Sequence, residues 1–253
     1  MSDIAETTQH DPIQDLRITV LYDNNLYKND LETAWGFACL IEGPDKTILF
    51  DTGGKGPILL ANMQKLGIQS ETIDVVVLSH EHWDHTGGLQ DFLGKHHNVT
   101  LYFPQSFSSD FKEKVKPYNT NIVEVDIATK ICNNVYSSGD IEGRIREQAL
   151  IIRTANGLIV ITGCAHPGIV KIIRATKDLL DDEVLFVMGG FHLKDDKQNT
   201  IASIISDFKQ LGVRYAAPCH CSGDAARAIF KERYQDHFIS IGVGTVLTME
   251  NVL

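Results

Sequence analysis

Apolar runs alternate with amphipathic segments along most of the chain, and this pattern predicts strands and helices in turn. In the first half, a helix is expected to begin at Pro57 and to stop at Gly67. A short helix is expected after Gly88, and a further helical piece between 103 and 121. The strands expected in this half are 16–23, 34–42, 47–50, 73–79, 99–103 and 121–126.

The second half begins rich in strands and then alternates between strand and helix. Strands are expected within 131–162, where Ala155, Asn156 and Gly157 form a hairpin turn. Helices are then expected at 168–180, 197–211 and 223–233, strands at 183–188 and 213–217, and two short strands at 237–248. Both halves therefore run strands, helix, strand. This order predicts an α/β fold with two mixed sheets packed together and helices outside, a four-layer αββα sandwich.

Composition fits one large globular unit. The 253 residues include 43% hydrophobic side chains, enough for a sizeable core. Residues 1–15 are polar and acidic and are expected to form a flexible N-terminal tail, whereas 16–253 are expected to form a single domain. The net charge of −10 argues against a broad surface for nucleic acid or an anionic membrane. A small anionic substrate stays compatible with this charge, because a bound metal ion dominates the field near it.

Five cysteines are scattered along the chain and match neither a disulfide framework nor the spacing of a structural zinc site. Reduced thiols of this kind predict a cytoplasmic protein. The first residues lack the basic and apolar regions of a signal peptide, and no apolar stretch approaches the length of a membrane span. The sequence leaves the oligomeric state open.

Residues 80–85 read His-Glu-His-Trp-Asp-His, directly after the apolar run of the strand expected at 73–79. Three imidazoles and one carboxylate within six residues offer the ligand atoms that zinc and similar divalent metals prefer. A polar loop that happens to be rich in histidine is the alternative. Because the cluster follows a buried strand, we favour a metal site at the rim of a sheet.

Four further apolar runs end abruptly in a residue that can bind metal: Asp51, His166, His192 and His220. Ligand sites of open α/β sheets lie at the carboxyl ends of the strands. Convergence of these edges explains all the positions together, whereas single positions have structural alternatives. His166 can cap the helix that follows it, and His192 can serve hydrogen bonds at the rim.

The motif His-x-His-x-Asp-His at 80–85, with Asp-Thr-Gly at 51–53 upstream and His166 downstream, resembles the metallo-β-lactamase superfamily. The resemblance covers most of the chain. It implies an αββα sandwich with a two-metal site at the sheet edges. Zinc most often fills this site in the family, and iron or manganese sometimes does.

By position, the resemblance implies that the ligands of the first metal ion are His80, His82 and His166. It implies that those of the second are Asp84, His85 and His220. Asp51 resembles the aspartate that orients ligand histidines by hydrogen bonding. The expected cofactor is Zn²⁺, one or two ions per chain, with iron or manganese as alternatives. Asp84 is expected to act in catalysis as an ionised ligand.

One departure concerns the second metal ion. Relatives that hold two metals tightly usually have a bridging aspartate at the end of the strand after His166, and here 187–192 contain no carboxylate. The second site is therefore expected to be weaker, more open or completed by substrate. His192 is expected to contact substrate during catalysis or to support a ligand, and metal ligation is its alternative role.

Further motifs at 22–24, 35–37, 162–169, 189–193 and 218–223 narrow the resemblance to one branch. They resemble a prokaryotic group labelled 7,8-dihydropterin-6-methyl-4-(β-D-ribofuranosyl)aminobenzene 5′-phosphate synthase, which implies pterin chemistry. The candidates for substrate binding are Asn24, His192 and Ser222. Ser222 opens a predicted helix whose free N–H groups suit a phosphate, and an ordinary N-cap is its alternative role.

Three functions are open at this point. The leading hypothesis is a hydrolase-like enzyme in which a metal-activated water acts on a small phosphorylated or pterin-like metabolite. A generic hydrolase of lactones, thioesters or phosphodiesters is the second, because one fold serves all of these reactions. A non-catalytic relative that binds metal or ligand is the third, and the missing bridging carboxylate supports it. No nucleic-acid or membrane partner is expected.

Overall fold

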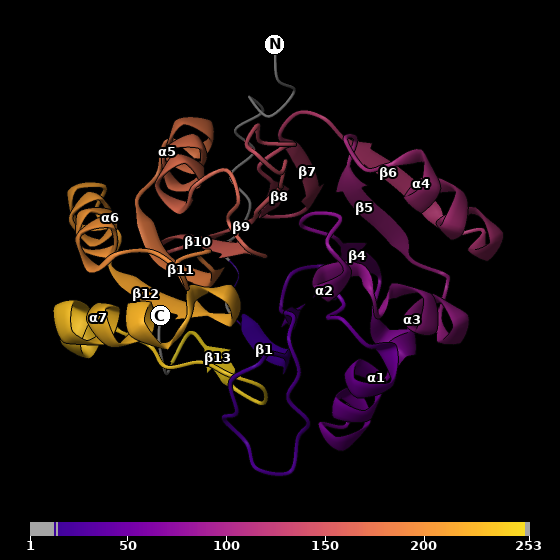
Figure 1. Cartoon of the computed structure of the whole chain (residues 1–253). Coiled ribbons are helices and arrows are strands. Elements are labelled where there is room, and N and C mark those ends of the chain that lie inside the picture. The colour runs from indigo at the N-terminus through magenta and orange to yellow at the C-terminus, as the bar shows by residue number, and fades with distance from the viewer. Residues whose placement is uncertain (1–12, 14, 251–253) are drawn as a thin grey trace.

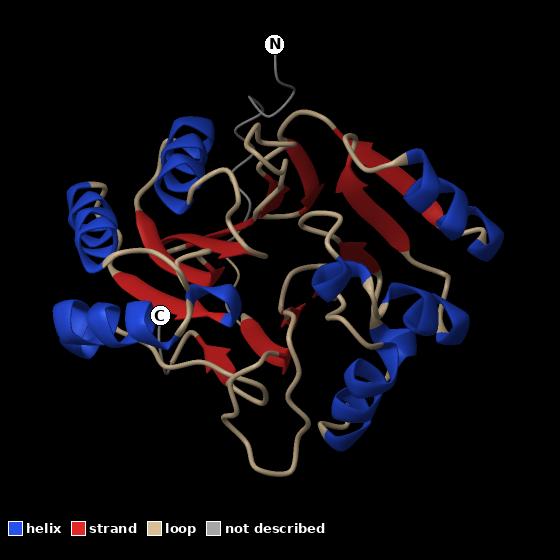
Figure 2. Ribbon diagram, in the orientation of Figure 1, coloured by secondary structure: helices blue, strands red, loops and turns tan. Residues whose placement is uncertain are grey.

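The structure is a computed structural model, and it describes residue 13 and residues 15–250. It confirms the predicted sandwich, in which two mixed sheets face each other and helices cover both outer faces (Figure 1). Figure 2 shows the strands in the middle and the helices along the two flanks. The tail expected at 1–15 lies almost wholly outside the described residues.

The first half of the chain, joined by one C-terminal strand, builds a seven-stranded sheet in the order β13-β1-β2-β3-β4-β5-β6. Strands β3 to β6 run parallel, since the chain returns between them through helices or turns on the outer face. The strands are β1 Arg17–Tyr22, β2 Ala38–Glu42, β3 Ile48–Phe50, β4 Val75–Val77, β5 Thr100–Pro104, β6 Asn121–Val125 and β13 Val246–Thr248.

The second half builds a six-stranded sheet in the order β12-β11-β10-β9-β8-β7. Strands β7 to β10 pair antiparallel, and β10, β11 and β12 pair parallel. The strands are β7 Thr129–Cys132, β8 Val135–Ser137, β9 Leu150–Thr154, β10 Gly157–Thr162, β11 Val184–Gly190 and β12 Tyr215–Cys219.

Helices pack an apolar face on each sheet. In α5, for example, Ile169, Ile172, Ile173 and Leu180 recur at helical spacing and are buried. The helices are α1 Gly56–Lys65, α2 Trp83–Thr86, α3 Leu89–Lys95, α4 Ser109–Val115, α5 Ile169–Leu180, α6 Gln198–Gln210 and α7 Asp224–Tyr234. Short 3-10 turns are η2 Ser70–Thr72, η3 Lys116–Tyr118, η4 His220–Ser222 and η5 Gln235–His237. Within the described residues, no helix combines the length and apolar character that crossing a bilayer requires.

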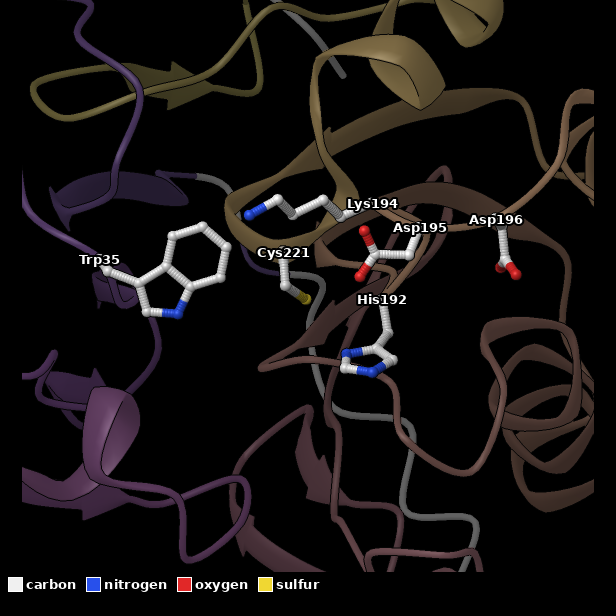
Figure 3. Close-up of a pocket in the computed structure, with 6 residues that line it drawn as sticks. All are labelled: Trp35, His192, Lys194, Asp195, Asp196 and Cys221. Carbon is white, nitrogen blue, oxygen red and sulfur yellow. The ribbon is translucent and has the colours of Figure 1, made fainter.

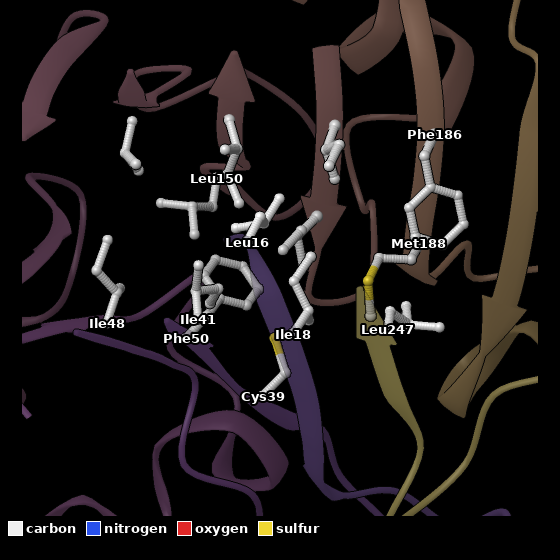
Figure 4. Packing of buried hydrophobic residues seen from close by; sticks show 14 of the residues in the cluster. Leu16, Ile18, Cys39, Ile41, Ile48, Phe50, Leu150, Phe186, Met188 and Leu247 are labelled. Carbon is white, nitrogen blue, oxygen red and sulfur yellow. The ribbon is translucent and has the colours of Figure 1, made fainter. Parts of the chain in front are cut away.

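Three apolar layers hold the sandwich together. Alternation along β3 turns Ile48 and Phe50 into the central layer between the sheets, and Leu49 into the layer under α1 and α3. Figure 4 shows the central layer, where side chains from both sheets interdigitate. A third layer lies between the second sheet and α5, α6 and α7.

Three predicted elements differ from the structure. The strand expected at 34–42 begins only at Ala38, because the backbone bends through Gly36, whose φ is 141°. The histidine-rich cluster contains a helical turn, α2, rather than only a loop. The described residues of 237–248 form one strand, β13, and Phe238 makes an isolated bridge to Ala216.

Candidate metal centre

Parallel strands deliver their carboxyl ends to one edge of the sandwich, and the predicted ligands lie there. Asp51 follows β3, and the 80–85 segment follows β4. His166 follows β10, His192 follows β11 and His220 follows β12. The two sheets face each other, so these five strand ends meet across the gap between them. Every metal-binding residue predicted from the sequence lies in this one place.

Three imidazole nitrogens form the first ligand group, from His80, His82 and His166. Nε2 of His80 lies 3.1 Å from Nδ1 of His82, and Nε2 of His166 lies 3.2 Å from the same atom. Tetrahedral zinc with nitrogen ligands at about 2.0–2.1 Å requires nitrogens roughly 3.3 Å apart. Both distances are close to this separation, and all three nitrogens lie within 4.8 Å of one another, so the group is suited to hold one such ion.

The second ligand group brings together side chains of Asp84, His85, His220 and Cys164, all of them buried. Oδ2 of Asp84 lies 3.2 Å from Nε2 of His220 and 3.7 Å from Nε2 of His85. Nε2 of His220 is enclosed and makes no hydrogen bond of acceptable geometry within the described residues. A buried polar atom in this state is costly unless a further group, such as a cation, satisfies it.

Hydrogen bonds fix which nitrogen of each histidine faces the centre. The buried carboxylate of Asp51 lies 2.7 Å from Nδ1 of His85 and accepts a bond of 2.8 Å from the hydroxyl of Ser79. The same hydroxyl lies 2.9 Å from Nδ1 of His80. Nδ1 of each imidazole is therefore engaged, and Nε2 is left to bind a metal. These contacts support the orienting role predicted for Asp51, which stays a prediction.

Asn24 makes an equivalent contact on the other side of the centre. Its Oδ1 lies 2.9 Å from Nδ1 of His220, and its Nδ2 donates to the backbone carbonyl of His220 at 3.3 Å. The sequence predicted Asn24 as a substrate ligand. The structure places its amide against His220, so it orients a histidine of the second group.

Glu147 is a residue of the centre that the sequence reasoning missed. Its carboxylate is fully buried just before the start of β9 and accepts four backbone N–H bonds of 2.9–3.0 Å. The donors are Gly163, Cys164, Ala165 and His166. Glu147 therefore holds the loop that carries the third histidine of the first group. An acidic residue just before the apolar run 149–152 was the only sign of it in the sequence.

The backbone is strained where the side chains converge. Asp51, Ala165, His192 and His220 have φ of 56°, 59°, 54° and 46°. Residues other than glycine rarely occupy this left-handed region, because the Cβ atom crowds the carbonyl oxygen. Strain concentrated in one place, and held by the surrounding hydrogen bonds, is typical of functional sites.

The first group is electrically suited to metal. Burial lowers the pKa of His80 well below its usual value, and the nearby His85 lowers it further. Burial also lowers the pKa of His166 to about 3, with His192 and then His82 adding to the effect. Both imidazoles are therefore neutral at pH 7, which is the form that binds a metal ion.

The second group pairs a negative carboxylate with a positive imidazole. Burial raises the pKa of Asp84, but the adjacent His220 and His85 outweigh this and bring the pKa well below its usual range. Burial lowers the pKa of His85, and the carboxylate of Asp51 more than compensates, raising the pKa to about 9. Asp84 is thus ionised at pH 7, as the sequence predicted, and a metal that binds here displaces a proton from His85.

Comparison with known proteins agrees with this geometry. The family model of the metallo-beta-lactamase superfamily matches residues 36–192, from the bend before β2 to His192 in the loop after β11. The chain belongs to the metallo-beta-lactamase superfamily. Its fold, and the position of its metal-binding groups at the sheet edges, are those that the sequence resemblance implied.

Two proteins of Methanocaldococcus jannaschii are similar along nearly their whole length. One is named 7,8-dihydropterin-6-methyl-4-(beta-D-ribofuranosyl)-aminobenzene-5'-phosphate synthase; it is 29% identical over 90% of this chain and 95% of its own. The other is uncharacterised and is 28% identical over 91% of this chain and 99% of its own. These matches support the branch of the superfamily that the motifs indicated.

A solved structure of similar shape is Tm1679, described as a metal-dependent hydrolase of the beta-lactamase superfamily. It superposes with a TM-score of 0.80 and 30% identity, over 92% of this chain and 98% of that one. The likeness extends over both sheets, so the whole sandwich is shared and not only the ligand motif.

A pocket of about 390 Å³ opens beside the second ligand group of this superfamily member (Figure 3). It is lined by Trp35, His192, Lys194, Asp195, Asp196 and Cys221. The ammonium of Lys194 lies 4.9 Å from the centre of the Trp35 ring, which in turn lies 4.9 Å from the ring of His220. His192 is exposed in this pocket, and its ring lies 4.4 Å from that of His166. The pocket therefore connects solvent to the metal-binding side chains.

Ser222 does not line this pocket. Its side chain is fully buried, and its hydroxyl accepts the N–H of Phe191 at 3.0 Å. The N-cap residue of α7 is Gly223, so the alternative that Ser222 caps this helix is wrong. The structure places Ser222 behind the site, where it ties the loop after β11 to the loop after β12.

Proposed function

We propose that this protein is a metal-dependent enzyme that holds two divalent ions and acts on a small phosphorylated or pterin-like metabolite. The observation that carries the proposal is the convergence of two ligand groups, from the ends of β4, β10 and β12, beside one pocket. Ligands of imidazole and carboxylate type favour Zn²⁺, with iron or manganese as alternatives.

The ligands divide between the ions as the two groups do. His80, His82 and His166 hold the first ion. Asp84, His85 and His220 hold the second. Ions held in this way supply an activated water and polarise a carbonyl or phosphoryl oxygen of the substrate. Asp51, Asn24 and Glu147 keep the ligands in position through the hydrogen bonds described above.

His192 is the residue that we propose to move a proton. It is exposed in the pocket, close to the first ligand group. Contact with Cys221 raises the pKa of His192 despite partial burial, which favours the protonated imidazole that a proton donor to a leaving group requires. Lys194, at the same opening, supplies positive charge for an anionic substrate.

The similar synthase guides the choice of substrate. Its name describes a product in which a dihydropterin is joined through a methyl group to an aminobenzene that carries a ribofuranosyl 5′-phosphate. We propose the same class of substrate here, a planar pterin and a phosphorylated ring. Trp35 and Lys194 offer an aromatic face and a cation for such groups.

All five cysteines are buried free thiols, which supports a reducing, cytoplasmic compartment.

Metal content and turnover test this function together. Purified protein is expected to hold two ions per chain by elemental analysis. It is also expected to join a dihydropterin that carries a phosphate ester on its 6-methyl carbon to a phosphoribosyl aminobenzene, with release of the phosphate as leaving group and of one proton from the aminobenzene. His82→Ala is expected to lose metal and turnover but keep its circular dichroism spectrum. His97→Ala, a change at an exposed histidine, is the matched control. Turnover in metal-free His82→Ala protein would refute the mechanism.

The substrate is decided separately. Lactones, thioesters and phosphodiesters form a parallel panel, and turnover of one of these without the pterin product would support the generic hydrolase instead. Bound metal without turnover of either set would support a non-catalytic metal-binding protein.

A further inference from the structure

The second ligand group contains a sulfur atom that the sequence reasoning did not use. Sγ of Cys164 lies 3.2 Å from Nε2 of His85, and the side chain is only 3% exposed. The ligand atoms of Cys164, Asp84, His85 and His220 all lie within 4.8 Å of one another. The thiol thus faces the same point as three side chains that bind the second ion in our proposal.

The backbone fixes this sulfur in place. The N–H of Cys164 donates to Oε1 of Glu147 at 2.9 Å, within the same set of bonds that positions His166. The next residue, Ala165, takes a left-handed conformation with φ of 59°. One loop therefore delivers a nitrogen to the first ligand group and a sulfur to the second, two residues apart.

Gly189 and Gly190, the last two residues of β11, leave no room for a ligand side chain in its place. A Cβ atom on Gly189 would lie 2.0 Å from the carbonyl oxygen of Thr162. A Cβ atom on Gly190 would lie 2.3 Å from the carbonyl oxygen of Gly163 and 2.6 Å from Sγ of Cys221. No side chain fits at either position without moving the backbone, so a carboxylate is excluded from this strand end. The space beside it is filled by the two cysteines.

We propose that Cys164, as a thiolate, is the fourth protein ligand of the second metal ion. The proposal rests on the two-metal function above and completes its ligand set as two nitrogens, one oxygen and one sulfur. Together with Asp84, the thiolate places two negative charges on one divalent ion. A soft sulfur ligand also favours zinc, iron or cobalt over magnesium and manganese at this position.

Spectroscopy of the metal-loaded protein tests the proposal without reference to turnover. Zinc-loaded wild-type protein is expected to show one sulfur neighbour per two ions in X-ray absorption, at about 2.3 Å. Cobalt(II)-loaded protein is expected to show a thiolate-to-metal charge-transfer band. Cys164→Ser should lose the sulfur neighbour and the band, and its second ion should bind at least tenfold more weakly.

Cys221→Ser is the matched control, because Cys221 forms a group with Cys164 and His192 but is not part of the group with Asp84, His85 and His220. It is expected to keep both signals. If the signals vanish in Cys221→Ser and persist in Cys164→Ser, the assignment is wrong. Should Cys164→Ser fail to fold, the wild-type spectrum alone decides, since two bound ions with only nitrogen and oxygen neighbours overturn the proposal. Wild-type protein that binds no metal would instead remove the proposed function itself.

Discussion

Glu147→Gln tests how the loop after β10 is held. The substitution keeps the shape of the side chain, and the amide oxygen can still accept from Gly163, Cys164 and Ala165. The amide nitrogen, however, lies opposite the N–H of His166, which in the wild-type protein donates to Oε2 of Glu147 at 2.9 Å. Two donors then face each other, and one bond to the carboxylate is lost. Burial raises the pKa of Glu147 to about 7, so the comparison is made at a pH above about 8, where the carboxylate is ionised and the bond is charge-assisted.

Loss of this hydrogen bond is expected to weaken metal binding, because the N–H belongs to His166, a proposed ligand of the first ion. A hydrogen bond to a charged group contributes about 1.5–3 kcal/mol. If the loop that carries His166 is destabilised by about 2 kcal/mol in its metal-binding conformation, the affinity for Zn²⁺ falls about 30-fold, since each 1.4 kcal/mol is a factor of ten. This lies within the roughly 10–100-fold range for residues that support metal ligands.

Competition with a chromophoric chelator measures the affinity of each variant for Zn²⁺. Glu142→Gln is the matched control, because it makes the same chemical change at an exposed position five residues away and should bind like wild type. The reasoning fails if Glu147→Gln, folded by circular dichroism, binds Zn²⁺ within about twofold of wild type.

Three further predictions address the second ion, the metal as a whole and pH. Asn24→Ala removes the partner of Nδ1 of His220, so the second ion should bind about tenfold more weakly in a stepwise titration while the first is unchanged; equal weakening of both would contradict this role. Chelation should lower the thermal midpoint, because Zn²⁺ at 100 times its Kd stabilises the fold by about 2.7 kcal/mol; an unchanged midpoint would show that metal does not bind the folded state. Metal-free protein should lose stability to urea as pH falls below 6.5, because burial lowers the folded pKa of His166 to about 3 and only the unfolded chain gains that proton in this window. His166→Gln should weaken this pH dependence of stability, and His97→Gln should not. Identical pH profiles for both variants would show that His166 is not the residue responsible.

Residues that follow a strong hydrophobic pattern were predictable from the sequence. The run 75–78 marks a buried strand, and the ligands directly after it could only lie at a sheet edge. The same reasoning placed His166 and His220, because each follows an apolar strand. Both were then found in the ligand groups.

Residues whose partners are backbone atoms were not predictable. Glu147 acts through four N–H groups that lie 16–19 positions further along the chain, and nothing in the spacing of side chains reports such bonds. Cys164 was interpreted only as a reduced thiol, since its approach to His85 depends on how two different sheets pack. Ser222 was placed at a helix start from its residue type, whereas Gly223 occupies that position.

The central layer between the sheets has a consequence for every ligand beyond it. Each ligand group draws side chains from both halves of the chain, so neither sheet alone presents a complete set of donor atoms. The distance between the donor atoms of one sheet and those of the other therefore depends on how Phe50 and its neighbours fill the gap between the sheets. In Phe50→Leu, the smaller side chain would let the two sheets move closer together by a fraction of an ångström. The affinity for zinc would change with that movement and would therefore report the distance between the sheets.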